Sequence, residues 1–256
     1  HVDDKRGVFV YPWEGTTVIG TTDLDHDEDL DLEASISDQE VDYLLKAFNS
    51  QFPDNTLKRS DVLSTWAGVR PVIGAEKNKN PSKERRDHAV WSDSGLITVS
   101  GGKLTTFRLI ALDALAAAKD NLPVAKEFID DRMFSTPKIS AQSLSPENSS
   151  WGQRLLGRYG DKAAELANDS SPDEQQNLGE TEFSLAECRW AIKYEAVEHL
   201  DDLLLRRTRL GMCLPNGGVT LYPALKEIFL SNRSWDNDRW QKEVNRYEKI
   251  WKNHYS

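Results

Sequence analysis

A serine- and proline-rich stretch, STPKISAQSLSPENSS at residues 135–150, divides the sequence into two parts with different patterns. Such clusters without hydrophobic periodicity are typical of linkers. Before the stretch, apolar residues show both strand-like and helix-like spacing, and after it nearly every periodic stretch has helical spacing. We therefore expect a mixed α and β region at 1–120, a connecting segment and linker at 121–150, and a small all-α domain at 151–256.

Hydrophobic spacing and turn residues predict the elements of the first part. Two apolar runs around a Glu-Gly pair predict a hairpin of two buried strands over 7–22. A capping box followed by helical spacing predicts a helix over 37–52. Further apolar patterns predict a strand over 61–73, two short strands over 88–100 and a helix over 104–119.

The second part contains one long amphipathic stretch, SLAECRWAIKYEAVEHLDDLLLRR, at residues 184–207. Its apolar residues recur at helical spacing, at Leu185, Cys188, Ile192, Ala196, Leu200, Leu203 and Leu204. This stripe predicts a continuous helix that packs one face into a helical core.

The stretch GLITVSGGKLTTFR at residues 95–108 passes from a strand pattern through two glycines to a helix pattern. Backbone N–H groups at such a turn converge on one point, where the helix dipole also favours an anion, and Lys103 would add a positive charge. The motif is neither GxGxxG nor a P-loop, and an ordinary strand-to-helix turn would use the same glycines. The turn alone therefore leaves anion binding and a purely structural role open.

Arg70 has a restricted backbone, because Pro71 follows it and favours an extended conformation. A guanidinium with a defined direction can bind a carboxylate or a phosphate through two parallel hydrogen bonds. Local sequence leaves two roles open for Arg70, an anion site and a structural ion pair with an acidic residue. For the lysines of the basic loop that follows, up to Arg86, we favour a solvated loop.

Residues 23–33, DLDHDEDLDLE, alternate acidic residues in a way that resembles a calcium-binding loop. Such a loop needs glycine at its sixth position and a bidentate glutamate at its twelfth, and this sequence has Glu28 and Ala34 there. We therefore expect a solvated acidic loop and no metal site.

The overall charge restricts the class of partner. A formal net charge of −10 argues against a general nucleic-acid binder, which needs a clustered basic face. The two cysteines, Cys188 and Cys213, have no metal-type spacing, so a reducing, cytoplasmic setting is expected. No apolar run approaches the roughly 18 residues that cross a bilayer, and peripheral membrane contact is left open.

Five motifs, in this order and at these separations, resemble the later part of the FAD-dependent glycerol-3-phosphate dehydrogenases of aerobic respiration. They are FVYPWEGTTVIGTTD, STWAGVRP, RRDH, GLITVSGGKLTTFR and YEAVEHLDDLLLRRTRLGM, and the resemblance extends from residue 7 to about residue 212. It implies an α+β or α/β portion of a two-domain flavin oxidoreductase, with part of the substrate-binding sheet and the last strand and helix of the FAD domain. A small all-α domain would follow.

The resemblance also implies site residues. Arg70, Arg86 and Lys103 match the family's substrate-binding cations, which suit the dianionic phosphate of glycerol 3-phosphate. The flavin would be approached by the residues of the glycine turn, which are Gly101, Gly102, Leu104, Thr105 and Thr106. The resemblance assigns no catalytic residue. Oxidation to dihydroxyacetone phosphate would reduce FAD, and the electrons would continue to membrane quinone.

The sequence departs from the family pattern because it contains no GxGxxG turn after a strand, the element that holds the FAD pyrophosphate. We therefore expect an incomplete cofactor site, so that this chain alone neither retains FAD nor oxidises the substrate. One alternative is a glycerol-3-phosphate oxidase, which reduces oxygen. Another is a helical interaction module, with LLLRRTR at 203–209 as a contact surface. A homodimer and a position at the inner face of the cytoplasmic membrane are left open.

Overall fold

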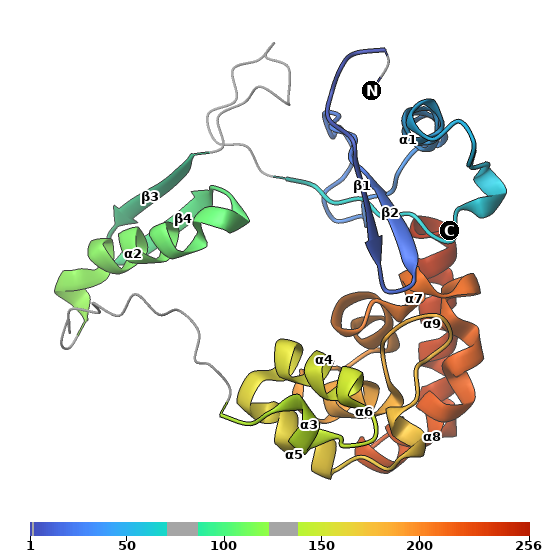
Figure 1. The fold of residues 1–256 in the computed structure, drawn as a ribbon. Helices are drawn as coiled ribbons and strands as arrows, with labels where there is room; N and C mark the ends of the chain where they lie inside the picture. The colour runs from blue at the N-terminus through green and yellow to red at the C-terminus, as the bar shows by residue number, and fades with distance from the viewer. Residues whose placement is uncertain (2, 71–86, 123–137) are drawn as a thin grey trace. The chain divides into compact units, whose positions relative to one another are not determined.

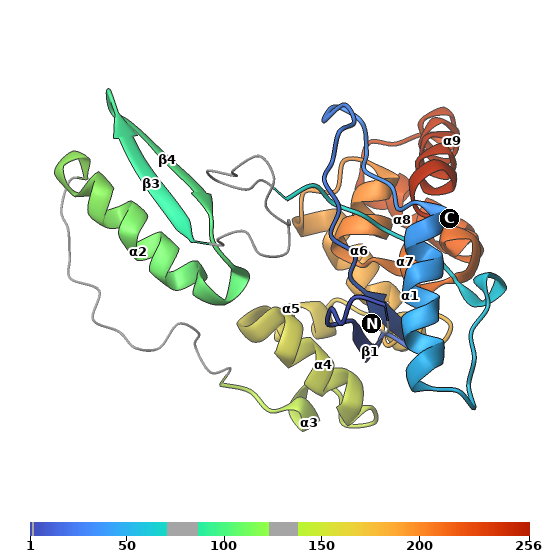
Figure 2. The same ribbon diagram turned by 90° about the horizontal axis from the view of Figure 1, so that it is seen from above.

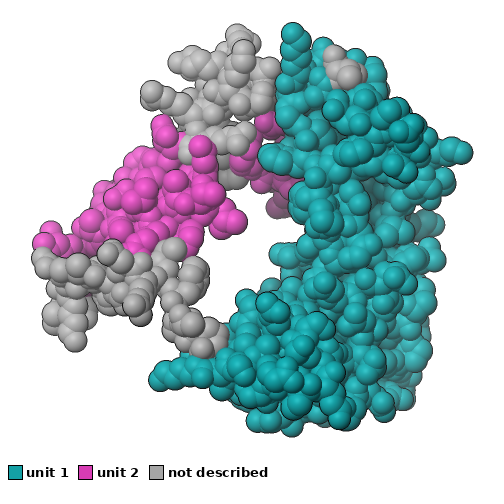
Figure 3. Space-filling view, in the orientation of Figure 1, with its two compact units in different colours: residues 1–22, 33–67, 134–256 teal, residues 23–32, 68–133 magenta. Residues whose placement is uncertain are grey.

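The computed structural model of the chain describes residues 1, 3–70, 87–122 and 138–256 (Figure 1). The chain forms two compact units, which Figure 3 colours separately. Unit 1 contains residues 1–22, 33–67 and 134–256, and unit 2 contains residues 23–32 and 68–133. The boundaries expected from the sequence at residues 120 and 150 stay predictions.

Unit 1 begins with a two-stranded antiparallel hairpin. Strand β1 (Phe9–Trp13) pairs with strand β2 (Thr16–Gly20), and the register places Phe9 opposite Gly20. The two residues between the strands have positive φ angles, 48° at Glu14 and 73° at Gly15, as two-residue hairpin turns require. The predicted hairpin is confirmed, but the expected burial is wrong for β1, which is largely exposed.

Helix α1 (Asp38–Gln51) begins at the predicted capping box. The Ser37 hydroxyl accepts the Glu40 N–H at 3.3 Å, and the Glu40 carboxylate accepts the Ser37 N–H at 2.9 Å. The helix ends at the C-cap Phe52, directly before Pro53, whose ring disfavours helical continuation. These short-range signals explain why the sequence predicts this helix well.

The strand predicted over 61–73 is not formed in its described part, residues 61–70. Polar groups of this segment bond helical parts of unit 1 instead of a neighbouring strand. The Thr65 N–H donates to the Tyr255 carbonyl at 2.8 Å, and the Ser64 hydroxyl donates to the Met212 carbonyl at 2.8 Å. An apolar run with strand-like composition is therefore used here as an irregular connection.

The remainder of unit 1 is helical. Its α-helices are α3 (Ala141–Leu144), α4 (Ser149–Tyr159), α5 (Ala163–Asn168), α6 (Leu185–Tyr194), α7 (Leu210–Cys213), α8 (Tyr222–Asn232) and α9 (Asn237–His254). A small core around Trp151 and Leu155 joins α4, α5 and α6. A larger core around Leu204, Phe229 and Tyr247 joins α6, α8 and α9 with the segment between α6 and α7.

The continuous helix predicted over 184–207 is broken in the structure. Helix α6 ends at Tyr194, and Ala196 has φ of 53°, which no right-handed helix accommodates. A π-helical turn then covers Asp202–Arg207. Because the chain changes direction at the break, Val197 and Leu200 both become fully buried in the larger core.

Unit 2 contains a second antiparallel hairpin, with β3 (His88–Asp93) paired to β4 (Leu96–Gly101). A single 3-10 turn, Leu104–Thr106, leads into helix α2 (Phe107–Ala118), which lies along one face of the hairpin in both ribbon views (Figures 1 and 2). The two strands and the helix predicted here are confirmed. No residue of unit 2 is buried within the ranges that the structure describes.

Candidate active site

The glycine turn between β4 and α2 has a backbone that strongly favours glycine. Gly101 and Gly102 have φ angles of 78° and 85°, in the left-handed region. A Cβ atom on Gly102 would lie 2.4 Å from Ile110 Cδ1 and 3.2 Å from His88 Cβ. The second glycine therefore allows the turn to pack closely against α2 and the start of β3.

Thr106 closes the first turn after the glycines. Its hydroxyl accepts the Lys103 N–H at 3.3 Å and donates to the Lys103 carbonyl at 3.0 Å. The first N–H groups of a helix have no acceptor within it, and those of Leu104 and Thr105 occupy these positions. The Leu104 side chain is 88% exposed beside them. The turn thus presents backbone donors together with an apolar side chain.

A histidine and an aspartate connect the strand and the helix behind this turn. His88 Nε2 lies 2.7 Å from Asp113 Oδ2, and His88 is paired with Gly101 in the β3–β4 register. This pair was not predicted from the sequence. Its only sequence signal is the position of His88 opposite the end of β4, which requires the register to be known.

The structure describes two of the three predicted substrate cations, Arg70 and Lys103. Arg70 follows an irregular segment and forms an ion pair, in which Nη2 lies 3.1 Å from Asp23 Oδ1. Lys103 has no recorded side-chain partner in the described part of the chain, and no bond recorded there joins it to Arg70. Arg86 and the basic loop before it lie outside the described residues. The role of all three in substrate binding stays a prediction.

A buried ionic network fixes the tip of the first hairpin onto the helical region. The fully buried Glu187 carboxylate accepts the Ser184 N–H at 2.9 Å and Arg154 Nε at 3.2 Å. Arg154 Nη2 also donates to Glu14 Oε1 at 2.9 Å. Burial lowers the pKa of Arg154, but Glu187 and Glu14 outweigh it and hold the pKa above its ordinary value.

The aromatic ring of Phe183 packs against the arginines of this network. The guanidiniums of Arg154 and Arg158 each lie 4.4 Å from the centre of its ring, a distance typical of cation–π contacts. Because all these polar groups have partners, the arrangement explains packing and stability without requiring a ligand. The network was not predicted from the sequence, because its members come from distant parts of the chain.

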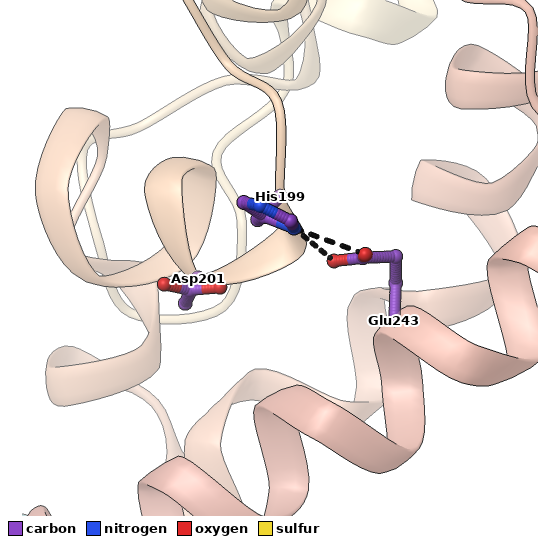
Figure 4. Close-up of side chains that lie close together, drawn as sticks. All are labelled: His199, Asp201 and Glu243. Carbon is purple, nitrogen blue, oxygen red and sulfur yellow. Dashed lines mark hydrogen bonds and ion pairs between the residues drawn. The ribbon is translucent and has the colours of Figure 1, made fainter.

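A second cluster, His199, Asp201 and Glu243, brings together three side chains that could bind a metal ion (Figure 4). His199 Nδ1 lies 3.0 Å from Glu243 Oε1, and both carboxylates are buried. One potential ligand atom from each residue lies within 4.8 Å of the others. Distance alone would therefore allow a cation here.

Arginines already bind both carboxylates of this cluster. Arg239 Nη2 lies 2.7 Å from Glu243 Oε1, Arg206 Nη1 lies 2.5 Å from Asp201 Oδ2, and Arg246 also pairs with Asp201. A divalent cation would have to displace these guanidiniums or share the site with their charge. We conclude that the cluster is an ion-pair network, which holds α9 against the segment before the π-helical turn.

Comparison with known proteins connects both parts of the chain to one group of enzymes. The family model described as "FAD dependent oxidoreductase" matches residues 1–110, and the model described as "C-terminal domain of alpha-glycerophosphate oxidase" matches residues 130–240. The chain is 29% identical to the mitochondrial glycerol-3-phosphate dehydrogenase of Bos taurus, over 94% of this chain and 35% of the relative. It is also 29% identical to the aerobic glycerol-3-phosphate dehydrogenase of Bacillus subtilis, over 96% of this chain and 48% of the relative.

A solved structure agrees with these relatives. The glycerol-3-phosphate dehydrogenase of Bacillus halodurans complexed with FAD aligns with a TM-score of 0.69 and 26% identity, over 98% of this chain and 51% of that chain. These matches support the predicted resemblance of the chain to part of an FAD-dependent glycerol-3-phosphate dehydrogenase.

The two family-model matches and the solved structure confirm the predicted fold class, a portion of an FAD-dependent oxidoreductase followed by a helical domain. FAD is the cofactor associated with the family. The chain spans between about a third and a half of the length of the relatives named above. Within the described residues, no helix is both long enough and apolar enough to cross a membrane.

Proposed function

We propose that this chain forms the substrate- and flavin-facing carboxy-terminal part of an FAD-dependent glycerol-3-phosphate dehydrogenase, which oxidises glycerol 3-phosphate to dihydroxyacetone phosphate. The observation that carries the proposal is the Gly101–Thr106 turn. Its paired left-handed glycines, its unsatisfied helix-start N–H groups and the exposed Leu104 are the features that a turn facing a flat, polar-edged ring needs. The sequence motif points to the same turn.

The residues of the turn fit the flavin end of FAD. Gly101 and Gly102 let the backbone approach a ligand closely, and Leu104 and Thr105 offer N–H donors to its polar edge. Thr106 keeps the donors in place through its two bonds to Lys103. When bound, FAD supplies the redox chemistry by accepting a hydride from the alcohol carbon of the substrate. The protein's part is to hold the ring and to align the substrate with it.

The substrate cations are Arg70, Arg86 and Lys103. A phosphate dianion suits guanidinium groups, which bind it through parallel hydrogen bonds, and an ammonium group, which acts as a point charge. By binding the phosphate, these side chains would fix the position of the secondary alcohol relative to the flavin turn. We assign no residue as the proton acceptor.

The electron acceptor distinguishes two versions of this function. In the first, electrons pass to quinone at the inner face of the cytoplasmic membrane, through a peripheral contact that the sequence leaves open. In the second, oxygen is the acceptor, and the match of residues 130–240 to the oxidase-type carboxy-terminal domain favours this candidate. The helical domain could in either case provide a homodimer contact.

The experiment uses the full-length protein that carries this chain. Purified protein is supplied with glycerol 3-phosphate or with glycerol, and reduction of a quinone analogue and release of peroxide are both measured. We expect reduction of the quinone analogue only with glycerol 3-phosphate. Peroxide in stoichiometric amounts would favour the oxidase, and no oxidation of glycerol 3-phosphate with either acceptor would contradict the proposed function.

The substrate role of Lys103 can be tested in the same assay. Lys103→Ala removes a charge-assisted contact worth roughly 1.5 to 3 kcal/mol, so we expect kcat/KM to fall by about tenfold or more. Lys119→Ala, an exposed lysine that directly follows α2, is the matched control and should leave kcat/KM unchanged. An unchanged kcat/KM in both variants would remove Lys103 from the site.

A further inference from the structure

The ion pair between Arg70 and Asp23 uses only one of the three nitrogen atoms of the guanidinium. Arg70 Nη2 lies 3.1 Å from Asp23 Oδ1 and 3.3 Å from Asp23 Oδ2, and no hydrogen bond of Nε or Nη1 is recorded among the described residues. A guanidinium carries five N–H donors in a planar fork. The pair therefore leaves donors on Nε and Nη1 that can bind a second anion while Asp23 stays in place.

This geometry has a consequence for the substrate site. We propose that Asp23 is a positioning residue, which binds one nitrogen of Arg70 and directs the remaining donors toward the phosphate of the substrate. This inference rests on the proposed function, because it takes Arg70 as a ligand of glycerol 3-phosphate. Asp23 itself would not touch the substrate.

Stability does not explain the pair well. The Arg70 side chain is 46% exposed and that of Asp23 is 25% exposed, and ion pairs in such settings contribute little to folding. The pair does restrict the direction in which the Arg70 guanidinium points. An arginine side chain has several rotatable bonds, and a carboxylate that holds one nitrogen reduces the freedom that would otherwise be lost when the substrate binds.

Two effects of Asp23 oppose each other, and they predict different outcomes. The carboxylate orients Arg70, which favours phosphate binding, and its negative charge repels a phosphate dianion, which disfavours it. The guanidinium contacts both anions directly and lies between them, whereas the two anions act on each other over a longer, partly solvated distance that salt screens. Orientation should therefore outweigh repulsion.

The test compares Asp23→Ala and Asp23→Asn with Asp25→Asn in the full-length protein. Asp25 is an exposed acid two residues along the same loop and has no recorded partner among the described residues, so its variant controls for the loss of negative charge from the loop. We measure kcat and KM for glycerol 3-phosphate, binding of glycerol 3-phosphate by calorimetry, and the melting temperature.

We expect the KM of Asp23→Ala to rise by about fivefold, as is typical of directly coupled residues, with kcat and the melting temperature nearly unchanged. Asp23→Asn retains an oxygen acceptor for Nη2 and should show a smaller rise, and Asp25→Asn should show none. In an Arg70→Ala background, Asp23→Ala should cause no further rise in KM, because the aspartate acts through the arginine.

Other outcomes overturn the inference. A KM that is unchanged or lowered in both Asp23 variants would show that the carboxylate does not orient Arg70 or that repulsion dominates. Equal additional loss in the Arg70→Ala background would show that Asp23 acts elsewhere. Calorimetry separates this inference from the proposed function. If the wild type binds glycerol 3-phosphate without oxidising it, the function fails and the Asp23 comparison is still made on the dissociation constant. A wild type that does not bind it overturns both.

Discussion

Helices α2 and α6 differ in a way that their sequences do not suggest. Helix α2 carries four leucine, isoleucine or phenylalanine positions within its first six residues, yet none of its residues is buried. Helix α6 alternates apolar with charged residues, yet six of its ten residues are buried, including the carboxylate of Glu187. The apolar composition of an element thus indicates how much of its own surface is favourable to bury. Whether that surface is buried depends on the other elements that pack against it.

Helix α2 exposes four large apolar residues. They are Phe107, Leu109, Leu112 and Leu115, each more than 40% exposed, and Leu104 precedes them. Unit 1 has two closed cores, whereas unit 2 has none among its described residues. The two units should therefore respond very differently to the same kinds of substitution.

The largest effect is expected from removing a buried charge in unit 1. Glu187→Ala leaves Arg154, which is only 10% exposed, without its main partner, and breaking a buried pair in this way costs about 3 to 5 kcal/mol of unfolding free energy. Glu182→Ala removes an exposed partner of the same arginine and should cost less than about 1 kcal/mol. Urea unfolding of the chain measures both, and equal costs would contradict the distinction between buried and exposed partners.

The next prediction compares the substitution of one leucine in each unit. Leu225→Ala in α8 removes a fully buried side chain and should cost about 2 to 5 kcal/mol. Leu115→Ala in α2 removes one that is 50% exposed, and it should change the unfolding free energy by less than about 1 kcal/mol. A large cost for Leu115→Ala in the chain by itself would show that unit 2 covers this helix after all.

A smaller effect should depend on pH. Burial raises the pKa of Asp201, but Arg206 and Arg246 outweigh it and hold the pKa below its ordinary value of 3.8. The unfolded state then binds more protons, so this carboxylate stabilises the fold above about pH 4, and the stabilisation is lost as the pH falls through the lower, folded-state pKa. Asp201→Asn should cost about 1.5 to 3 kcal/mol at pH 7 and progressively less toward pH 3.

The corresponding pair in unit 2 provides the control for this pH dependence. Asp113 is 61% exposed beside His88, so Asp113→Asn should alter the unfolding free energy by less than about 1 kcal/mol at either pH. Urea midpoints at pH 7 and pH 3 measure both variants. If Asp201→Asn were equally costly at both values, its ion pairs would not be the source of the stabilisation.

The sequence predicted the elements whose signals are local. The capping box at Ser37, the hairpin turn at Gly15 and the glycine turn at Gly101 each depend on residues that lie within a few positions of one another. The failures have a different origin. No glycine or proline near Ala196 indicates that the helix breaks there. The segment around Thr65 bonds to Tyr255, which lies 190 positions away in the chain.

The candidate site shows the same division. The shape of the glycine turn could be predicted from the sequence, because two adjacent glycines before a helix are typical of a turn with positive φ angles. The partner of Arg70 could not be chosen from the sequence, because the chain has 42 acidic residues and Asp23 has no local feature that distinguishes it from the others in its loop. Ion pairs between distant residues depend on the fold and therefore require the structure.

The bond between Glu14 and Arg154 also bears on the order in which the chain folds. It joins residues 140 positions apart, and the entropy of closing so long a loop must be lost before the contact forms. The helices that present Arg154 and Glu187 are held mainly by contacts closer in sequence. We therefore expect the first hairpin to dock late, onto helices that have already assembled, so that substitutions at Glu14 accelerate unfolding more than they slow folding.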